Sequence, residues 1–295
     1  MNSYRAFSDA NRLAPGKVTL VSDSGTSNSV WVCQNGPQEL FILKYFSEDD
    51  HGSLHFRAER DFITGNESLA FMPELIGYDD NRNWLATRFI KSSQKTKFQL
   101  KDLLEIVTKD FNHLKLSFQA HEFPPGVLNL NLHSYEKSPL QTVIESELLD
   151  LDWFPEFIQE VKTFWKSNSI AHGDMKLSNL AMSQNQIAIF DWENVSLGPR
   201  EWDLAGILQS VIAESLGSRE VKMWSIRNLQ YCIDRIIDLD DFTRKCFALR
   251  CVQSAFEFSS TSSLMPRLAV NMLQIADYAA NNDESKLRKI SDYAS

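Results

Sequence analysis

The stretch that decides the fold runs from residue 170 to residue 206 and reads IAHGDMKLSNLAMSQNQIAIFDWENVSLGPREWDLAG. Between its polar residues lies the short apolar run IAIF, residues 187–190, which has the length and β-branched content of a buried strand. The run predicts a strand that ends at Asp191. Polar side chains of the kinds that bind metals or act in catalysis lie before and after it at short, uneven intervals: His172, Asp174, Asn179, Asp191 and Asp203.

A carboxylate at the end of a strand, with a second aspartate and an asparagine on the preceding loop, is an arrangement for a hard cation. Oxygen ligands of this kind suit Mg²⁺, which shares its coordination with phosphate oxygens and water. The five-residue step from Asp174 to Asn179 also matches the kinase loop H-x-D-x-x-x-x-N, in which one loop serves both the acceptor hydroxyl and a metal. Taken singly, each of these residues could instead cap a turn.

The motifs His-Gly-Asp-x-x-x-x-Asn, Asp-Trp-Glu and Asp-Leu-Ala together resemble the catalytic core of the aminoglycoside phosphotransferase and choline kinase superfamily. The resemblance implies an α+β, bilobal protein-kinase-like fold. It places a small β-rich, nucleotide-binding lobe at residues 1–90 and a larger helical lobe, for catalysis and acceptor binding, at residues 91–295. It also implies ATP or GTP as phosphate donor, Asp174 as the residue that orients the acceptor, and Mg²⁺ held by Asn179 and Asp191.

The first part of the chain reads as a run of strands, at residues 17–24, 29–34 and 39–46, with two more at 73–78 and 84–90. Lys44 lies inside the third strand on the same predicted face as Ile42 and Phe46. A sheet-edge lysine that reaches solvent is one interpretation. In the kinase template, a third-strand lysine instead contacts the α- and β-phosphates and pairs with a glutamate on the next helix.

Two further nucleotide-binding elements follow from the resemblance. Residues 54–64 predict a helix whose central acid, Glu59, would pair with Lys44, with Asp61 as the weaker candidate. The first loop would cover the phosphates, although it lacks the protein-kinase G-x-G-x-x-G pattern, and it contributes Ser24, Gly25, Thr26 and Ser27. No G-x-x-x-x-G-K-[ST] motif occurs, which excludes the P-loop class.

The remainder of the chain is predicted to be helical. Apolar residues recur at helical spacing over 100–119, from Pro155 onward with Asp152 as a cap, and after Asp203. Residues 123–138 are rich in turn formers and predict a loop. Strands first and helices afterwards indicate an α+β fold.

Differences between these motifs and those of protein kinases limit the classes of acceptor that the protein could phosphorylate. Gly173 replaces the arginine that pairs with an activation-loop phosphate, and only twelve positions separate Asp191 from Asp203, too few for a peptide platform. A small-molecule hydroxyl acceptor follows. Acidic helix residues such as Glu214, or an aromatic cage that includes Trp202 and Trp224, would suit a cationic acceptor.

Three residues of the motif region have a second interpretation: His172, Lys176 and Glu193. His172 is predicted to be a structural member of the catalytic loop, the alternative being a proton shuttle. Asp203 is also predicted to be structural, and the resemblance implies that it opens a helix and hydrogen-bonds the catalytic loop. Lys176 either neutralises γ-phosphate charge or is a solvated loop lysine. Glu193 is either a surface acid or a group near the metal.

Composition sets the remaining limits. The formal net charge of −9 argues against a nucleic-acid partner. No apolar run is long enough for a transmembrane helix and the polar N-terminus lacks a signal-peptide core, so we expect a cytoplasmic protein without a membrane partner. The cysteines, which fit no metal spacing, are expected to be buried free thiols: Cys33, Cys232, Cys246 and Cys251.

The sequence therefore predicts a Mg²⁺-dependent small-molecule kinase. Two alternatives remain: a kinase-like binding or scaffold protein without turnover, and an atypical protein kinase.

Overall fold

The computed structural model describes residues 17–23, 28–35, 39–92, 97–116, 125–129, 138–165, 169–183, 186–217, 223–260 and 265–293. The chain divides into two compact units, which we call the strand unit and the helical unit. The strand unit comprises Met1–Lys97, Lys115–Gln119 and Asn179–Val195; the helical unit comprises Phe98–Leu114, Ala120–Ser178 and Ser196–Ser295. The linear division at residue 90 stays a prediction.

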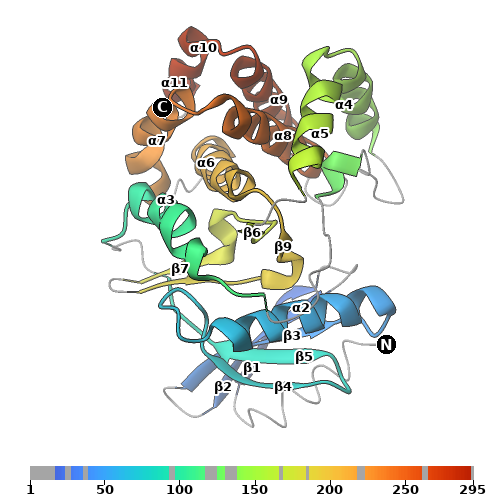
Figure 1. Ribbon diagram of the computed structural model, residues 1–295, viewed down its shortest axis with the longest axis vertical. Coiled ribbons are helices and arrows are strands. Elements are labelled where there is room, and N and C mark those ends of the chain that lie inside the picture. Colours follow the sequence, from blue (N-terminus) through green and yellow to red (C-terminus); the bar gives the residue numbers. More distant parts are fainter. Residues whose placement is uncertain are drawn as a thin grey trace. The chain divides into compact units, whose positions relative to one another are not determined.

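The strand unit is built on a five-stranded antiparallel sheet with the order β1-β2-β3-β5-β4 (Figure 1). A short hairpin, β7–β8, belongs to the same unit. The bounds of its elements are β1 Lys17–Asp23, β2 Asn28–Asn35, β3 Glu39–Phe46, α2 Asp50–Asn66, β4 Leu75–Asp79, β5 Trp84–Arg88, β7 Leu180–Met182, β8 Ile187–Ile189 and the 3-10 helix η4 Trp192–Asn194.

Period-two alternation gives this sheet two apolar faces. One face carries a buried cluster that includes Trp31, Leu43 and Trp84. The other face carries Phe46 and Leu85, which pack against Phe56 of helix α2. Because β3 is the central strand, Lys44 cannot be a sheet-edge lysine, and that interpretation is wrong.

Helix α2 begins earlier than predicted because Asp49 caps it. The Asp49 carboxylate accepts the backbone N–H of Gly52 at 2.7 Å, and this satisfies a donor that the first turn would otherwise leave unbonded. The helix then buries Phe56, Phe62 and Ile63. Its apolar face is therefore fixed on the sheet side that also carries Lys44.

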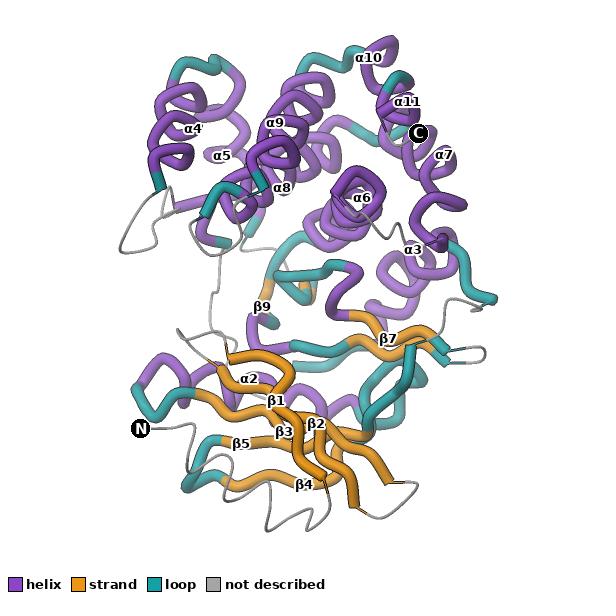
Figure 2. The backbone as a smooth tube through the Cα atoms, turned by 180° about the vertical axis from the view of Figure 1, so that it is seen from behind, coloured by secondary structure: helices purple, strands orange, loops and turns teal. Residues whose placement is uncertain are grey.

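The helical unit contains the remaining helices and one short strand pair, β6–β9 (Figure 2). The bounds are α3 Leu100–Lys109, η1 Asp110–His113, η2 Gly126–Asn129, α4 Pro139–Leu149, α5 Trp153–Phe164, β6 Ile170–Ala171, β9 Ser196–Leu197, α6 Arg200–Gly217, α7 Met223–Ile237, α8 Asp241–Phe258, α9 Pro266–Ala280, α10 Glu284–Arg288 and α11 Ile290–Tyr293; η3 Leu177–Asn179 lies where the chain passes from this unit to the other.

Three helix predictions need correction. The helix predicted over 100–119 ends at Lys109, with one 3-10 turn to His113, and the Asn66 side-chain amide then bonds both backbone groups of Lys115. Helix α5 starts at Trp153, and the Asp152 side chain makes no capping bond. Helix α4 is absent from the predicted elements, although Ser138 and Gln141 form a capping box at its start.

The class prediction is confirmed, since a β-rich unit and a larger helical unit are both present. All four cysteines are buried and free, as expected. Among the helices that the structure describes, none has the length and apolar character needed to span a membrane.

Gly52 provides a test of the α2 start. A Cβ at this position would lie 2.1 Å from Ser47 Oγ and 2.4 Å from Ser47 O, so the backbone that holds the cap would have to shift. We expect Gly52→Ala to lower the free energy of unfolding by about 2 kcal/mol. Gly77→Ala is the matched control, because a Cβ there meets nothing within 4 Å, and its effect should stay within about 0.5 kcal/mol. Urea denaturation measures both, and equal values would contradict the close packing of Gly52 on Ser47.

Candidate functional site

Lys44 forms the centre of a charged cluster in the strand unit. Its ammonium lies 2.8 Å from Glu59 Oε2 and 2.7 Å from Glu193 Oε2, and it also donates to Asp191 Oδ1. Lys44 and Glu59 are 6% and 3% exposed. The structure therefore brings together the two predicted residues Lys44 and Glu59, which lie on β3 and α2, and adds two acids from the segment after β8.

The electrostatics of this cluster keep the lysine charged. Burial would lower the pKa of Lys44, but the charges of Asp191, Glu59 and Glu193 outweigh it and hold that pKa well above its ordinary value. Burial is also the main cause that raises the pKa of Glu59 to about 7, and the ammonium of Lys44 opposes that rise. A lysine paired in this way cannot leave the cluster without exposing uncompensated charge.

The β7–β8 hairpin brings Asn179 and Asp191 to the same end. Leu180 pairs with Ile189, and the Phe190 N–H donates to the Asn179 carbonyl at 2.8 Å, so the next residue is Asp191. Asp191 itself adopts the left-handed conformation, with φ 67° and ψ 48°. This region is uncommon for residues other than glycine, and such outliers concentrate at functional sites.

Trp192 holds this turn against helix α2. Its ring is fully buried, with its centroid 4.6 Å from that of Phe62, and its indole N–H donates to the Ile189 carbonyl at 2.7 Å. Its backbone N–H donates to Glu59 Oε1 at 3.3 Å. The same tryptophan therefore fixes the backbone beside Asp191 and orients the glutamate that pairs with Lys44.

Glu193 is a member of the cluster and not a surface acid. Its side chain is 16% exposed, accepts a hydrogen bond from Asn28 Nδ2, and has ligand oxygens within 4.8 Å of those of Glu59 and Asp191. Its backbone carbonyl lies 2.8 Å from His55 Nδ1. No sequence pattern points to His55, because its partner is distant along the chain.

The predicted phosphate loop, Ser24, Gly25, Thr26 and Ser27, lies outside the described residues. Its role in covering the nucleotide phosphates therefore stays a prediction.

In the helical unit, Asp203 holds the loop that follows β6. Its two carboxylate oxygens accept the backbone N–H groups of His172, at 2.7 Å, and Gly173, at 3.1 Å. Gly173 has φ 84°, a left-handed turn in which glycine avoids a Cβ clash. Asp203 and His172 are both fully buried, and His172 Nδ1 accepts the Asp174 N–H at 3.3 Å. Both side chains therefore contribute hydrogen bonds to this loop, and the structural roles expected for them stay a prediction.

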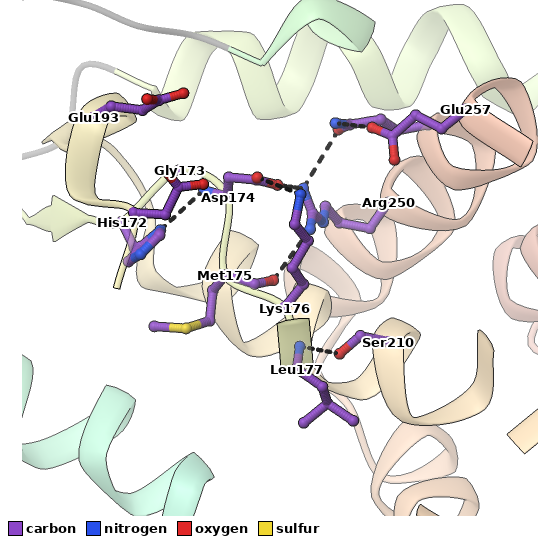
Figure 3. Close-up of polar contacts among 12 residues, drawn as sticks. His172, Gly173, Asp174, Met175, Lys176, Leu177, Glu193, Ser210, Arg250 and Glu257 are labelled. Atoms are coloured by element: carbon purple, nitrogen blue, oxygen red, sulfur yellow. Dashed lines mark hydrogen bonds and ion pairs between the residues drawn. The ribbon is translucent and has the colours of Figure 1, made fainter. Parts of the chain in front are cut away.

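Asp174 projects from this loop with a cation on each oxygen (Figure 3). Lys176 Nζ donates to Oδ2 at 2.6 Å, and Arg250 Nη1 lies 3.5 Å from Oδ1. The Asp174 side chain is 20% exposed and that of Lys176 is 35% exposed, whereas Arg250 is almost wholly buried. Burial would lower the pKa of Lys176, but Asp174 outweighs that effect and raises it.

The residues considered for a cationic acceptor have other partners. Trp202 is fully buried and donates its indole N–H to the Gly173 carbonyl at 3.0 Å. Trp224 is 5% exposed and donates to the Phe98 carbonyl at 2.8 Å. Glu214 accepts the Ser225 hydroxyl at 2.9 Å. The two tryptophans therefore serve the packing of the helical unit.

Arg250 is the residue of this unit that sequence reasoning misses. Its signal is an arginine in the middle of the apolar stripe 242–258, between Leu249 and Cys251. A charge on the buried face of a helix needs a partner, and periodicity alone does not identify that partner.

The burial of Asp203 leads us to expect that the free energy of unfolding depends on pH. Burial raises its pKa from 3.8 to about 7, against the effect of the His172 and Gly173 N–H groups. The folded state therefore binds this proton more tightly than the unfolded chain does. The resulting stabilisation is fully present below the unfolded pKa and is lost as the pH rises through the folded pKa.

We expect Asp203→Asn to flatten the decrease of unfolding free energy between pH 3.8 and about 7. Urea denaturation at a series of pH values measures this slope. The control is Asp152→Asn, which changes an exposed acid whose side chain makes no capping bond. Parallel curves for Asp203→Asn and the parent protein would contradict the buried-proton assignment.

Three solved structures that resemble this chain carry the names of small-molecule kinases. Aminoglycoside phosphotransferase APH(4)-Ia matches with a TM-score of 0.58 and 11% identity over 95% of this chain and 99% of that chain. Choline kinase LicA from Streptococcus pneumoniae matches with a TM-score of 0.57 and 12% identity over 95% and 99%. An amicoumacin kinase in complex with AMP-PNP and Ca²⁺ matches with a TM-score of 0.58 and 11% identity over 95% and 94%. These likenesses confirm the predicted fold.

No curated protein sequence matches the chain. A model of the phosphotransferase enzyme family, however, matches residues 18–235, which is well over half of the sequence. The chain therefore belongs to the phosphotransferase enzyme family.

Proposed function

We propose that this protein is a Mg²⁺-dependent O-phosphotransferase that moves the γ-phosphate of ATP to a hydroxyl of a small molecule. GTP is the alternative donor. The observation that carries the proposal is the buried Lys44 ammonium, held by Glu59 and by Asp191, next to an end of a hairpin that also carries Asn179. Family membership supports the reaction type.

Lys44 is the proposed contact for the nucleotide phosphates. In kinases, phosphoryl transfer depends on positioning and charge neutralisation, and a lysine–glutamate pair fixes the α- and β-phosphates. The short Lys44–Glu59 ion pair has the required partners on strand β3 and helix α2. AMP-PNP in the structure of the amicoumacin kinase supports ATP as the donor.

The oxygen donors at the hairpin end fit Mg²⁺. Asn179 and Asp191 offer an amide and a carboxylate oxygen, and three carboxylates gather around one ammonium: Glu59, Asp191 and Glu193. This excess of negative charge favours a further cation, and hard oxygen ligands favour Mg²⁺. When bound, Mg²⁺ would neutralise charge on the transferring phosphate. Lys44 keeps these acids oriented, and the left-handed turn at Asp191 directs its carboxylate.

Asp174 is the proposed group that orients the acceptor hydroxyl. Its carboxylate is partly exposed, and its backbone is fixed by the bonds that Asp203 accepts from His172 and Gly173. Because the transition state of phosphoryl transfer is loose, the carboxylate chiefly aligns the nucleophile. Lys176, the more exposed cation beside it, is the proposed partner for γ-phosphate charge.

The acceptor is proposed by class only. The acidic chain, with a net charge of −9, is compatible with a cationic amino alcohol or aminoglycoside, and a sugar hydroxyl remains an alternative. A screen of Mg-ATP consumption over aminoglycosides, amino alcohols and sugars tests the proposal. Nucleotide binding without phosphorylated product would favour the silent binding protein, and efficient peptide phosphorylation would favour a protein kinase.

Asp174→Ala tests the acceptor-orienting role. We expect kcat to fall by about a hundredfold or more, while nucleotide still raises the melting temperature, because this substitution leaves the Lys44 cluster intact. Steady-state kinetics and thermal shift measure the two effects. Asp150→Ala, which removes an exposed acid at the end of α4, is the control. Unchanged turnover in Asp174→Ala would remove Asp174 from the mechanism.

Asp191→Ala tests the metal role. We expect the variant to lose the part of the nucleotide-induced thermal shift that depends on Mg²⁺, because the carboxylate at the hairpin end is gone. Titration of ATP with Mg²⁺ and with EDTA separates the metal-dependent part. Glu74→Ala, which breaks an exposed ion pair with Arg88 in the same unit, should behave like the parent. A full Mg²⁺-dependent shift in Asp191→Ala would contradict the assignment.

A further inference from the structure

Arg250 has an unusual place for an arginine. It lies in the middle of helix α8 and is 3% exposed, among neighbours such as Leu249 and Cys251 that are fully buried. Arginine is almost never fully buried unless its charge is paired. Its contacts therefore show which part of the helical unit requires a buried positive charge.

The polar contacts of this guanidinium lead chiefly to the loop that carries Asp174 (Figure 3). The guanidinium donates through Nη2 to the Met175 carbonyl at 3.1 Å, and Nη1 lies 3.5 Å from Asp174 Oδ1. A further contact is made to Gln253, one turn along the same helix, whose Oε1 is 3.5 Å from Nη1. One planar group thus engages the backbone of Met175 and the side chain of Asp174.

Trp202 completes the support on another side. The guanidinium carbon lies 5.4 Å from the centroid of the Trp202 ring, a cation–π distance. The same indole donates to the Gly173 carbonyl at 3.0 Å. Arg250 therefore supports three consecutive loop residues. It contacts Asp174 and Met175 directly, and it supports Gly173 indirectly, through Trp202.

Gly206 makes the close approach of this arginine to the loop possible. A Cβ at this position of helix α6 would lie 2.2 Å from the Met175 carbonyl oxygen and 3.0 Å from Arg250 Nη2. Any larger residue would push the loop backbone or the guanidinium away. The Asp-Leu-Ala-Gly end of the motif region therefore leaves space for Arg250 as well as supplying Asp203.

The two cations on Asp174 differ in what they can reach. The Arg250 side chain is 4% exposed and cannot meet a substrate, whereas that of Lys176 is 35% exposed. Arg250 also acts on Asp203, since its charge opposes the rise in the pKa of that buried acid. It is therefore the shared counter-charge of two carboxylates in the helical unit.

We propose that Arg250 is a positioning residue that fixes the carboxylate of Asp174 by holding the Gly173–Met175 backbone and Asp174 Oδ1 from the buried side. The inference rests on the proposed function, in which Asp174 orients the acceptor hydroxyl. Oδ1 then lies beside the buried Arg250, whereas Oδ2 accepts from Lys176, whose side chain is the more exposed of the two cations. Loss of Arg250 then misaligns the carboxylate without removing a group that touches the nucleotide.

The test compares Arg250→Lys and Arg250→Met with Arg244→Met. Arg244 is the matched control, because it lies on the same helix α8 and pairs with Asp241 at 2.7 Å. Turnover is measured with the acceptor found in the screen, and also as ATP hydrolysis with water as acceptor. We expect kcat to fall about a hundredfold in Arg250→Met and less in Arg250→Lys, with the nucleotide KM within about twofold of the parent value.

A second readout does not depend on activity. Hydrogen exchange of the His172, Gly173 and Leu177 amides should accelerate in both Arg250 variants and not in Arg244→Met, while the amides of helices α6 and α9 keep their protection. A kcat for Arg250→Met within about threefold of the parent, or an equal loss in Arg244→Met, would overturn the proposal. So would unchanged exchange of the loop amides.

The two readouts also separate this inference from the proposed function. A parent protein that turns over no acceptor, water included, would overturn the phosphotransferase proposal and the kinetic role of Arg250 with it. Hydrogen exchange would still decide whether Arg250 holds the loop. Normal turnover in the parent and in Arg250→Met would overturn the positioning role alone.

Discussion

The helical unit depends on one buried carboxylate, that of Asp203. By accepting the N–H groups of His172 and Gly173, it joins the first turn of helix α6 to the loop after β6. A buried acceptor that takes two backbone hydrogen bonds fixes both residues, and the left-handed Gly173 allows the loop to turn there. The direction of Asp174 is a consequence of this arrangement, because the backbone on its N-terminal side is fixed.

The strand unit meets a different constraint, which is the accumulation of like charges. One ammonium is shared by three acids: Glu59, Asp191 and Glu193. Glu59 also accepts the Trp192 N–H, and Glu193 accepts a hydrogen bond from Asn28. Asp191 is held in a left-handed turn. Repulsion among carboxylates would drive them apart if Lys44 were absent. The Lys44 ammonium therefore compensates the charge of three acids that also have contacts elsewhere in the unit.

Local patterns predict many of the elements, because each of these depends on neighbours in the sequence. The strands around Lys44 and the helix that carries Glu59 follow from periodicity, and the hairpin end from the run IAIF. Tertiary bonds decide what these patterns miss. Asn66 hydrogen-bonds the backbone of Lys115, just after helix α3 and its 3-10 turn end. Arg250 hydrogen-bonds the Met175 carbonyl, which lies 75 residues away in the sequence. Such long-range pairs leave only an anomaly in the pattern, such as a charge in an apolar stripe.

The assignment of Asn179–Val195 to the strand unit has a consequence for how this chain can be divided. The polypeptide enters the helical unit, returns to the strand unit twice, at Lys115–Gln119 and at Asn179–Val195, and ends in the helical unit, so the two units are interleaved in sequence. A fragment that ended at Lys97 would lack both Asn179 and Asp191. The units are thus not modules that recombination could exchange by a single crossover, and a change in either one must remain compatible with a chain that passes between them more than once.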